Sequence, residues 1–293
     1  MNIAFIGLGV MGLPMSLNLI KGGHRVRGYT LLEKDMAAFV AGGGIAAKSS
    51  AEAVRDAGLI ISMLPAGEHV RAAVFDPGGI AGGMPESALY VDMSTIGPLE
   101  TDRIRGQLAG RGLSMMDAPV GRTSAAARTG TLLIFAGGTP EQIARAEPAF
   151  KCMGERTIDC GGAGRGIRMK LVNNFMSISL NALASECMVF ADALGVSRPL
   201  AIDVMGGTPA GRGHFTTTYP KKVFANDLAP DFALNLAHKD LGLALDAANT
   251  LHVPLPLGAA AREIYSMARA KKMGALDWTA LLRFYEETAN PKG

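Results

Sequence analysis

The strongest constraint on the fold of this chain is the alternation of short apolar runs with helical patterns through its first half. Six apolar runs are short enough to be strands and lie at residues 2–6, 25–29, 59–64, 89–93, 113–117 and 132–136. They are mostly continuous rather than alternating in polarity, as in strands that are buried on both faces. Helical patterns lie between them at residues 15–21, 33–41, 50–56, 67–74 and 98–111. This alternation predicts a doubly wound, mostly parallel sheet.

The second half of the chain has a different character, with helical patterns and almost no strand candidates after about Gly161. Its longest pattern covers residues 164–194, which contain no proline and would form a helix that crosses a whole domain. Further helices are predicted at residues 199–204, 215–226, 232–251, 257–272 and 278–288. We therefore predict an α/β Rossmann domain over residues 1–162 and an all-helical domain over residues 163–293, joined by the long helix.

Composition excludes several classes of protein. With 293 residues, 48% of them hydrophobic, the chain can bury a full core, which excludes intrinsic disorder. A net charge of +3 without a basic cluster does not favour nucleic-acid binding, and no apolar run approaches the ~18 residues of a membrane span. Three cysteines without a CxxC pair indicate a reducing cytoplasm, and five histidines without ligand spacing predict no metal site.

A glycine-rich loop follows the first predicted strand and opens a helix. Its residues are Gly7-Leu8-Gly9-Val10-Met11-Gly12, a GxGxxG pattern. In such a loop Gly7 makes the tight turn, Gly9 lets the backbone approach a pyrophosphate, and Gly12 allows close packing of helix against strand. The helix N-terminus supplies free N–H groups and the positive end of the helix dipole. The pattern in this position predicts a dinucleotide site.

The residue that usually distinguishes the two nicotinamide cofactors is altered. An acidic residue at the end of the second strand would bind the adenosine ribose hydroxyls, but Thr30 occupies that position. Threonine can bind a ribose hydroxyl and does not repel a 2′-phosphate, while the following Leu31 and Leu32 offer that phosphate no cation. This turn therefore leaves the choice between NADH and NADPH open.

The long helix carries a narrow polar stripe. Lys170, Asn174, Ser177 and Asn181 are spaced by four, three and four residues, so they share one face, with Asn173 beside them. The stripe could face solvent on an ordinary amphipathic helix, but buried polar groups need partners and such a stripe also suits a ligand. A lysine with a lowered pKa can act as an acid or base at a carbonyl. We predict that Lys170 does so and that Asn173 or Asn174 orients it or holds the substrate.

Several motifs appear together in a characteristic order. They are the glycine loop, Asp92-Met93-Ser94-Thr95, Asp117-Ala118-Pro119-Val120, Gly130-Thr131-Leu132, Lys170-Leu171-Val172-Asn173-Asn174 and Lys239-Asp240-Leu241. Over its whole length the chain resembles the β-hydroxyacid dehydrogenases, the group of 3-hydroxyisobutyrate dehydrogenase and its relatives. The resemblance implies that Lys170 is the catalytic acid or base, that Asn174 assists it, and that Met63, Leu64, Pro65, Thr95 and Lys239 contact the cofactor. It also implies a homodimer or homotetramer.

One departure from the family pattern bears on the substrate. Where the family generally has Ser-Gly-Gly after Asp-Ala-Pro-Val, this chain has Gly121-Arg122-Thr123-Ser124. That segment, with residues 213–217, is similar to the sulfolactaldehyde reductase subgroup, which uses NADH in sulfosugar breakdown. A guanidinium can bind two oxygens of a sulfonate while hydroxyl and amide donors take the third.

The predicted function is therefore reduction of a small anionic aldehyde, 3-sulfolactaldehyde above others, with NAD(H) favoured as cofactor. Gly121, Arg122, Thr123, Asn173 and Ser177 are the predicted substrate residues, and Arg212 and His214 are secondary candidates. Two alternatives stay open. One is a dehydrogenase of 3-hydroxyisobutyrate or 4-hydroxybutyrate, and the other is a nucleotide-binding regulator without activity. Neither the physiological direction nor the size of the oligomer follows from the sequence.

Overall fold

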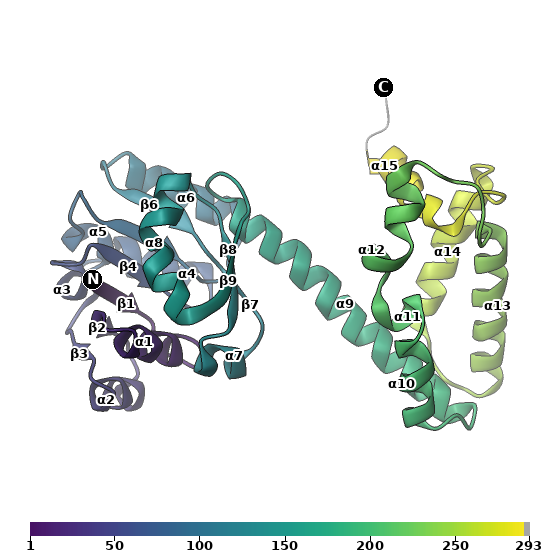
Figure 1. The fold of residues 1–293 in the computed structure, drawn as a ribbon, viewed down its shortest axis with the longest axis horizontal. Coiled ribbons are helices and arrows are strands. Elements are labelled where there is room, and N and C mark those ends of the chain that lie inside the picture. Colours follow the sequence, from purple (N-terminus) through teal and green to yellow (C-terminus); the bar gives the residue numbers. More distant parts are fainter. Residues whose placement is uncertain (290–293) are drawn as a thin grey trace. The chain divides into compact units, whose positions relative to one another are not determined.

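The computed structural model describes residues 1–289 and divides the chain into two compact units, Met1–Phe175 and Met176–Gly293 (Figure 1). The first unit contains all the named strands and the second consists of helices, which confirms the predicted fold class. This division falls inside the long helix α9 (Arg165–Ala193). The assignment of residues 1–162 and 163–293 to two functional domains stays a prediction.

The main sheet has six parallel strands in the order β3-β2-β1-β4-β5-β6. Its strands are β1 (Asn2–Ile6), β2 (Arg25–Tyr29), β3 (Ile45–Ala46), β4 (Leu59–Ser62), β5 (Leu89–Asp92) and β6 (Ser114–Asp117). The register pairs Ile6 with Tyr29 and Ser62, Ser62 with Asp92, and Asp92 with Asp117. The carboxyl ends of five strands therefore lie along one edge, and the order matches the dinucleotide-binding arrangement.

Helices connect and cover these strands. They are α1 (Gly12–Lys21), α2 (Glu33–Ala41), α3 (Ser50–Val54), α4 (Gly67–Phe75), α5 (Ile80–Gly83), α6 (Pro98–Ala109), α7 (Ser124–Thr129) and α8 (Pro140–Met153). Successive strand residues belong to different apolar clusters: Phe5 and Ile61 to one, Ile6 and Ile60 to the other. Because neighbouring strand side chains point to opposite faces, the sheet is buried on both sides, as its continuous apolar runs predict.

The sixth predicted strand does not belong to the main sheet. Residues 132–136 form β8 (Leu132–Ala136), which lies in a separate three-stranded sheet between β7 (Val120–Gly121) and β9 (Gly154–Asp159). Its pairing with β7 is antiparallel and its pairing with β9 is parallel. Assigning it to one doubly wound sheet was therefore wrong, because its apolar character shows that it is buried but not which strands it pairs with.

The second unit contains most of α9 and the remaining helices. These are α10 (Arg198–Gly206), α11 (Pro209–Arg212), α12 (His214–Thr217), α13 (Leu234–Thr250), α14 (Pro256–Ala270) and α15 (Leu281–Ala289), with short 3-10 turns at Tyr219–Lys221, Val223–Ala225 and Trp278–Ala280. The single helix predicted at residues 215–226 is wrong. Pro220 lacks an N–H and restricts the residue before it, so α12 ends and the chain continues in two 3-10 turns.

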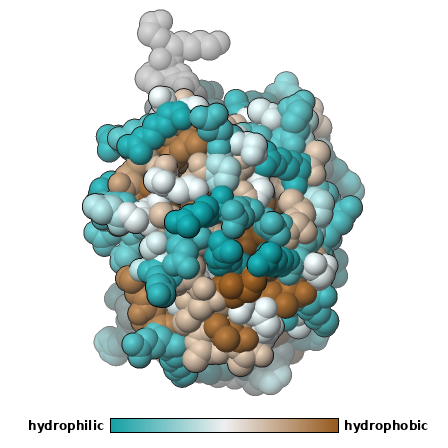
Figure 2. Space-filling model, turned by 90° about the vertical axis from the view of Figure 1, so that its left-hand side faces the viewer, coloured by the Kyte–Doolittle hydropathy of each residue, from teal (hydrophilic) through white to brown (hydrophobic). Residues whose placement is uncertain are grey.

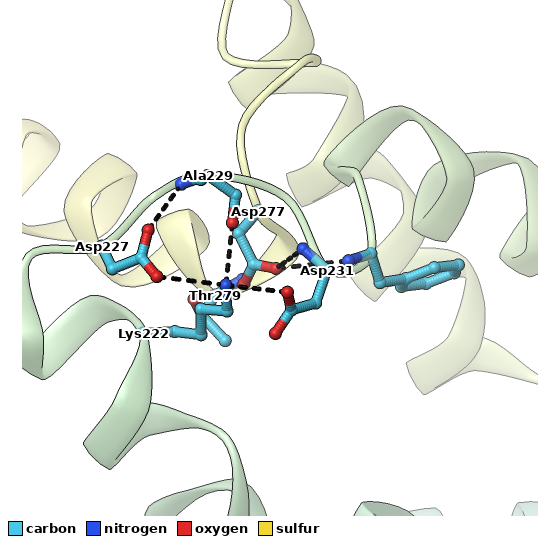
Figure 3. A network of polar contacts seen from close by, with 7 residues as sticks. Lys222, Asp227, Ala229, Asp231, Asp277 and Thr279 are labelled. Carbon is cyan, nitrogen blue, oxygen red and sulfur yellow. Dashed lines mark hydrogen bonds and ion pairs between the residues drawn. The ribbon is translucent and has the colours of Figure 1, made fainter.

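A polar cluster around Lys222 fixes the chain after these turns (Figure 3). The Lys222 ammonium lies 3.2 Å from an Asp227 carboxylate oxygen and 3.0 Å from one of Asp231, and donates to the Ala229 carbonyl. Beside it, the buried Asp277 carboxylate accepts hydrogen bonds from the backbone of Asp231 and from Thr279. Since every polar group named here has a partner, we interpret the cluster as structural.

On the face drawn in Figure 2, hydrophobic side chains form small patches between hydrophilic ones, as on an ordinary solvated surface. Among the residues that the structure describes, no helix combines the length and the apolar character needed to cross a bilayer.

Candidate active site

The glycine loop follows β1 at its carboxyl end. The strand order of the main sheet reverses at this strand, which has β2 on one side and β4 on the other. Gly7 has a left-handed backbone (φ 92°), and a Cβ there would lie 2.4 Å from the Met63 carbonyl oxygen. A Cβ on Gly12 would lie 1.9 Å from the Gly7 carbonyl oxygen. Both positions therefore require glycine because of the protein's own packing, as the turn and helix–strand contact of a dinucleotide loop demand.

Gly9 differs from these two glycines. A Cβ on Gly9 would meet no protein atom within 4 Å, so the fold itself leaves this position open. The next helix, α1, begins at Gly12 without a side-chain cap on its N-terminus. An open backbone beside an uncapped helix N-terminus suits a pyrophosphate group. These residues fit the dinucleotide that the motif predicts. Of the other loop residues, Leu8 is buried in the core, Met11 packs against that core and Val10 is exposed.

We expect Gly9→Ala to weaken NADH binding without destabilising the protein, because the new methyl group meets no protein atom but narrows the approach to the pyrophosphate. A rise of about tenfold or more in the Kd for NADH, measured by fluorescence titration, is the expected result. Gly106→Ala in α6 is the matched control, since its Cβ is equally open and its backbone is helical. Equal Kd values for the two variants would contradict the assignment of Gly9.

A buried polar chain supports the loops that carry Leu64, Pro65 and Thr95. The Tyr90 hydroxyl lies 2.7 Å from Ser62 Oγ, and Ser62 Oγ donates to the Asp92 carboxylate at 2.8 Å. Asp92 also accepts from the Ser94 N–H, and Ser94 Oγ accepts from the Leu64 N–H at 2.9 Å. The loops after β4 and β5 are therefore tied together at the same sheet edge as the glycine loop. Burial raises the pKa of both Tyr90 and Asp92.

Thr30 directly follows β2, as predicted, and lies at the carboxyl edge of the main sheet. Its Oγ1 accepts a hydrogen bond from the Leu32 N–H at 3.3 Å, so it shapes its own turn. The Leu31 side chain is 82% exposed and carries no charge toward a ribose or a phosphate. The Thr30 hydroxyl is therefore the polar side-chain group that residues 30–32 offer at this turn.

The polar stripe lies on α9, which is unbroken from Arg165 to Ala193 and so keeps the predicted helical spacing. Lys170 is half-buried, and burial lowers the pKa of its ammonium group. Asn173 donates from Nδ2 to Asn174 Oδ1 at 3.4 Å. The helix begins at the carboxyl end of β6, because the Asp117 carboxylate accepts from the Gly164 and Ile167 N–H groups. Lys170 thus lies in the second turn of a helix that begins at the carboxyl end of β6.

Arg122 lies in the connection between β7 and α7, with Gly121 buried before it and Thr123 at the N-cap of α7. It is one of the non-glycine residues with a left-handed backbone (φ 75°), in the position where the family generally has glycine. Its guanidinium forms an ion pair with Glu155 of β9 and donates to the Thr131 carbonyl at 2.7 Å. Side chains in this backbone region carry strain that is often retained at functional sites.

Two predicted residues belong to the second unit, and they are described within it. Ser177 is exposed on α9, and Lys239 is exposed on α13 with its ammonium 3.0 Å from the Asp240 carboxylate. The secondary candidates are tied into local structure. The Arg212 side chain donates to the Gly206 carbonyl, while the His214 ring packs edge-on against Trp278 and lies 2.9 Å from Thr218 Oγ1.

Sequence reasoning missed the ion-pair partner of Arg122. Glu155 is 33 residues away and becomes its neighbour only through the pairing of the three-stranded sheet, so no local pattern indicates it. Cys160 and Cys187 are free thiols that are half-buried. Within residues 1–289, no group of three or more histidine, cysteine or acidic side chains is arranged to hold a metal ion.

Comparison with known families accounts for nearly the whole chain. Residues 2–162 match the model of the NAD binding domain of 6-phosphogluconate dehydrogenase. Residues 164–285 match the model described as NAD-binding of NADP-dependent 3-hydroxyisobutyrate dehydrogenase. The two matches meet near the beginning of α9.

Among similar proteins, the chain is 53% identical over 280 residues to 3-sulfolactaldehyde reductase of Escherichia coli K12, covering 96% of this chain and 94% of that one. It is 34% identical to 3-hydroxyisobutyrate dehydrogenase of Pseudomonas aeruginosa, covering 97% and 98% of the two chains. A structure of Mycobacterium tuberculosis 3-hydroxyisobutyrate dehydrogenase with L-serine matches with a TM-score of 0.67 at 34% identity, over 97% and 98%. An imine reductase of Myxococcus stipitatus with NAD+ shares the fold, with a TM-score of 0.87 at 14% identity, over 97% and 99%.

Proposed function

The chain belongs to the β-hydroxyacid dehydrogenases, the NAD-dependent oxidoreductases that group with 3-hydroxyisobutyrate dehydrogenase, and we propose that it reduces 3-sulfolactaldehyde to 2,3-dihydroxypropane-1-sulfonate. One observation carries the choice of substrate. An arginine occupies the left-handed position after β7, in a chain that is 53% identical to a 3-sulfolactaldehyde reductase. A cation at the substrate loop favours an anionic aldehyde over a neutral one.

NADH supplies the hydride when it is bound, and the chain's own residues supply the proton and the positioning. Lys170 donates a proton from Nζ to the aldehyde oxygen as the carbon is reduced, which yields the alcohol. Partial burial prepares the lysine for this step, because it lowers the pKa of the ammonium toward working pH. Asn174, one turn along α9, orients the ammonium or the substrate oxygen. Lys239 on α13 is assigned to cofactor binding by the family resemblance alone.

Recognition of the sulfonate is assigned to five residues. Arg122 binds two of its oxygens, and Asn173 and Ser177 donate hydrogen bonds to the third. Gly121 and Thr123 flank Arg122 and shape the loop, with Thr123 exposed at the beginning of α7. To bind the substrate, Arg122 exchanges its ion pair with Glu155 for the sulfonate, and both side chains are exposed enough to move.

Steady-state kinetics with three aldehydes test the proposal. We expect kcat/KM with NADH to be highest for 3-sulfolactaldehyde and at least about tenfold lower for the semialdehydes of methylmalonate and succinate. Comparable efficiency with all three would refute sulfonate recognition. Preference for a carboxylated substrate would support the second candidate, which the 34% identity to a 3-hydroxyisobutyrate dehydrogenase favours. Tight NADH binding without any turnover would support a regulatory role instead.

We also propose that the chain forms a homo-oligomer through α9. Large apolar side chains on this helix are strongly exposed: Val172 at 62%, Phe175 at 76% and Ile178 at 68%. Covering such side chains is favourable by about 1.5–3 kcal/mol each, and a second copy of the chain presents the same surface. A homodimer or homotetramer is consistent with this symmetry.

The oligomer has a direct test. We expect Ile178→Glu to lower the mass measured by light scattering toward that of one chain, because a charge would have to be buried in the contact. Val40→Glu is the matched control, since Val40 is an exposed apolar residue on α2, far from α9 in the sequence. A wild-type protein that runs as a single chain at micromolar concentration would contradict the proposal.

A further inference from the structure

We propose that Asp117 is a positioning residue, which holds the beginning of α9 so that Lys170 points to the substrate oxygen. The inference rests on the proposed role of Lys170 and adds a second residue to that machinery. It follows from the contacts of a single carboxylate at the carboxyl end of β6, within the first unit.

The Asp117 carboxylate uses both oxygens on the helix. Oδ1 accepts from the Gly164 N–H at 2.5 Å and Oδ2 from the Ile167 N–H at 2.7 Å. Gly164 directly precedes the helix and Ile167 is its third residue, and the N–H groups at this end of a helix have no internal partners. A carboxylate at this end also interacts favourably with the helix dipole. Two directed bonds fix both the position and the rotation of the first turn.

Asp117 itself has little freedom to move. Its backbone exchanges hydrogen bonds with Gly137, at 3.2 Å from the Asp117 N–H and 2.7 Å from the Gly137 N–H. The residue is 3% exposed. Asp92 on β5, Arg105 on α6, Arg168 on α9 and the thiol of Cys160 are the titratable groups that interact with its carboxylate. Burial raises the pKa of Asp117, and the backbone N–H donors oppose that rise.

Close packing around the Asp117 carboxylate restricts the position of the α9 backbone. A Cβ on Gly166 would lie 2.2 Å from the Phe135 carbonyl oxygen and 2.9 Å from Asp117 Oδ2. A Cβ on Gly137 would lie 2.5 Å from the Gly166 nitrogen. The helix backbone therefore contacts β8 and the following turn directly. On the other side, Arg168 forms an ion pair with Asp102 of α6 at 2.7 Å.

Lys170 follows Ile167 by three residues, which is about one helical turn. A shift of the first turn therefore moves Lys170 by a similar distance, because the helix between them is continuous. Misplacement of a catalytic group by about 1 Å can lower the rate by roughly 100-fold. The contacts of Asp117 thus determine whether Lys170 is in reach of the forming alkoxide, although Asp117 does not contact the substrate.

The test compares Asp117→Asn, Gly166→Ala and Asp92→Asn in the full-length protein, with the active fraction counted by NADH binding. Asp117→Asn replaces one acceptor oxygen with an amide, and Gly166→Ala keeps the carboxylate but displaces the helix. We expect both to lower kcat per active site by about tenfold or more, with little change in the Kd for NADH. We also expect the pH midpoint of kcat to move, because the burial of Lys170 changes with its position.

Asp92→Asn provides the contrast. Asp92 is a buried carboxylate on the adjacent strand, but it supports the loop of Leu64, so its loss should change the Kd for NADH and not the pH midpoint. If Asp117→Asn lowers only the melting temperature and leaves kcat and the pH midpoint unchanged, the positioning role is wrong. If Lys170→Ala itself keeps full activity, the proposed function of Lys170 fails first, so the two failures are distinguishable.

Discussion

We expect Lys170→Ala to lower kcat for aldehyde reduction by about 10²- to 10⁴-fold, the range that one acid–base group contributes. The alanine variant cannot donate a proton to the forming alkoxide, while the glycine loop that binds the dinucleotide is untouched. The Kd for NADH should therefore stay close to the wild-type value. Single-turnover kinetics with saturating NADH measure the chemical step directly.

The control for this variant is a lysine outside the site. Lys151 on α8 is largely exposed and pairs with Glu147 on the same helix, so Lys151→Ala should keep kcat within about twofold of the wild type. Loss of NADH binding in Lys170→Ala, rather than loss of turnover, would indicate that Lys170 contacts the cofactor and not the substrate.

The pH dependence of the two directions follows from the protonation state that each needs. Burial lowers the pKa of Lys170 below that of a free lysine. Reduction requires the ammonium, so its kcat should fall as pH rises through this pKa. Oxidation of the alcohol requires the neutral amine, so its kcat should rise over the same interval. Plots of kcat against pH for reduction and for oxidation should therefore have the same midpoint. The residual activity of Lys170→Ala should show no change with pH at that midpoint.

The second large effect is expected for Arg122→Gly, which removes the guanidinium. Glycine adopts the left-handed backbone of this position without strain, so the fold should be kept. We expect KM for 3-sulfolactaldehyde to rise by about 10- to 100-fold with a smaller change in kcat, since the lost bonds form in both ground state and transition state. Efficiency with succinate semialdehyde should change less, which shifts the substrate preference.

Glu155→Gln separates substrate binding from a structural role of the ion pair. If Arg122 matters only because it ties β9 to the β7–α7 connection, both variants should show the same defect. If Arg122 binds the sulfonate, loss of the competing carboxylate should leave KM unchanged or lower it. A KM that rises equally in the two variants would therefore remove Arg122 from substrate recognition.

The parts of the fold that could be predicted are those in which burial dominates. The strands β1, β2 and β8 have the predicted bounds. β1 and β8 are nearly continuous apolar runs, whereas β2 (RVRGY) alternates between buried and more exposed residues. β9 was not predicted, since its sequence GERTID is polar and largely exposed and it becomes a strand only by pairing with β8. α8 was also missed; Pro148 lies inside it and obscures the helical pattern.

The same division holds for the site. The glycine turn at Gly7 and Gly12 and the helical position of Lys170 could be predicted from spacing, because they depend on local geometry and helix periodicity. Glu155 and the capping role of Asp117 could not, because both depend on contacts between elements far apart in the sequence. The polar stripe of α9 was predicted from the pattern, but the strong exposure of apolar side chains on the same helix was not, since a sequence does not show what covers a helix.

The separate three-stranded sheet has a consequence for how this enzyme could acquire new substrates. Arg122 and Glu155 stand on or beside its strands, whereas the glycine loop and its supporting network belong to the six-stranded sheet. The side chains of Arg122 and Glu155 are exposed, so their exchange leaves the residues of the dinucleotide loop and its core contacts unchanged. Under the proposed role of Arg122, the substrate preference can therefore change by one or two substitutions on or beside the small sheet, while the residues that bind the dinucleotide stay the same.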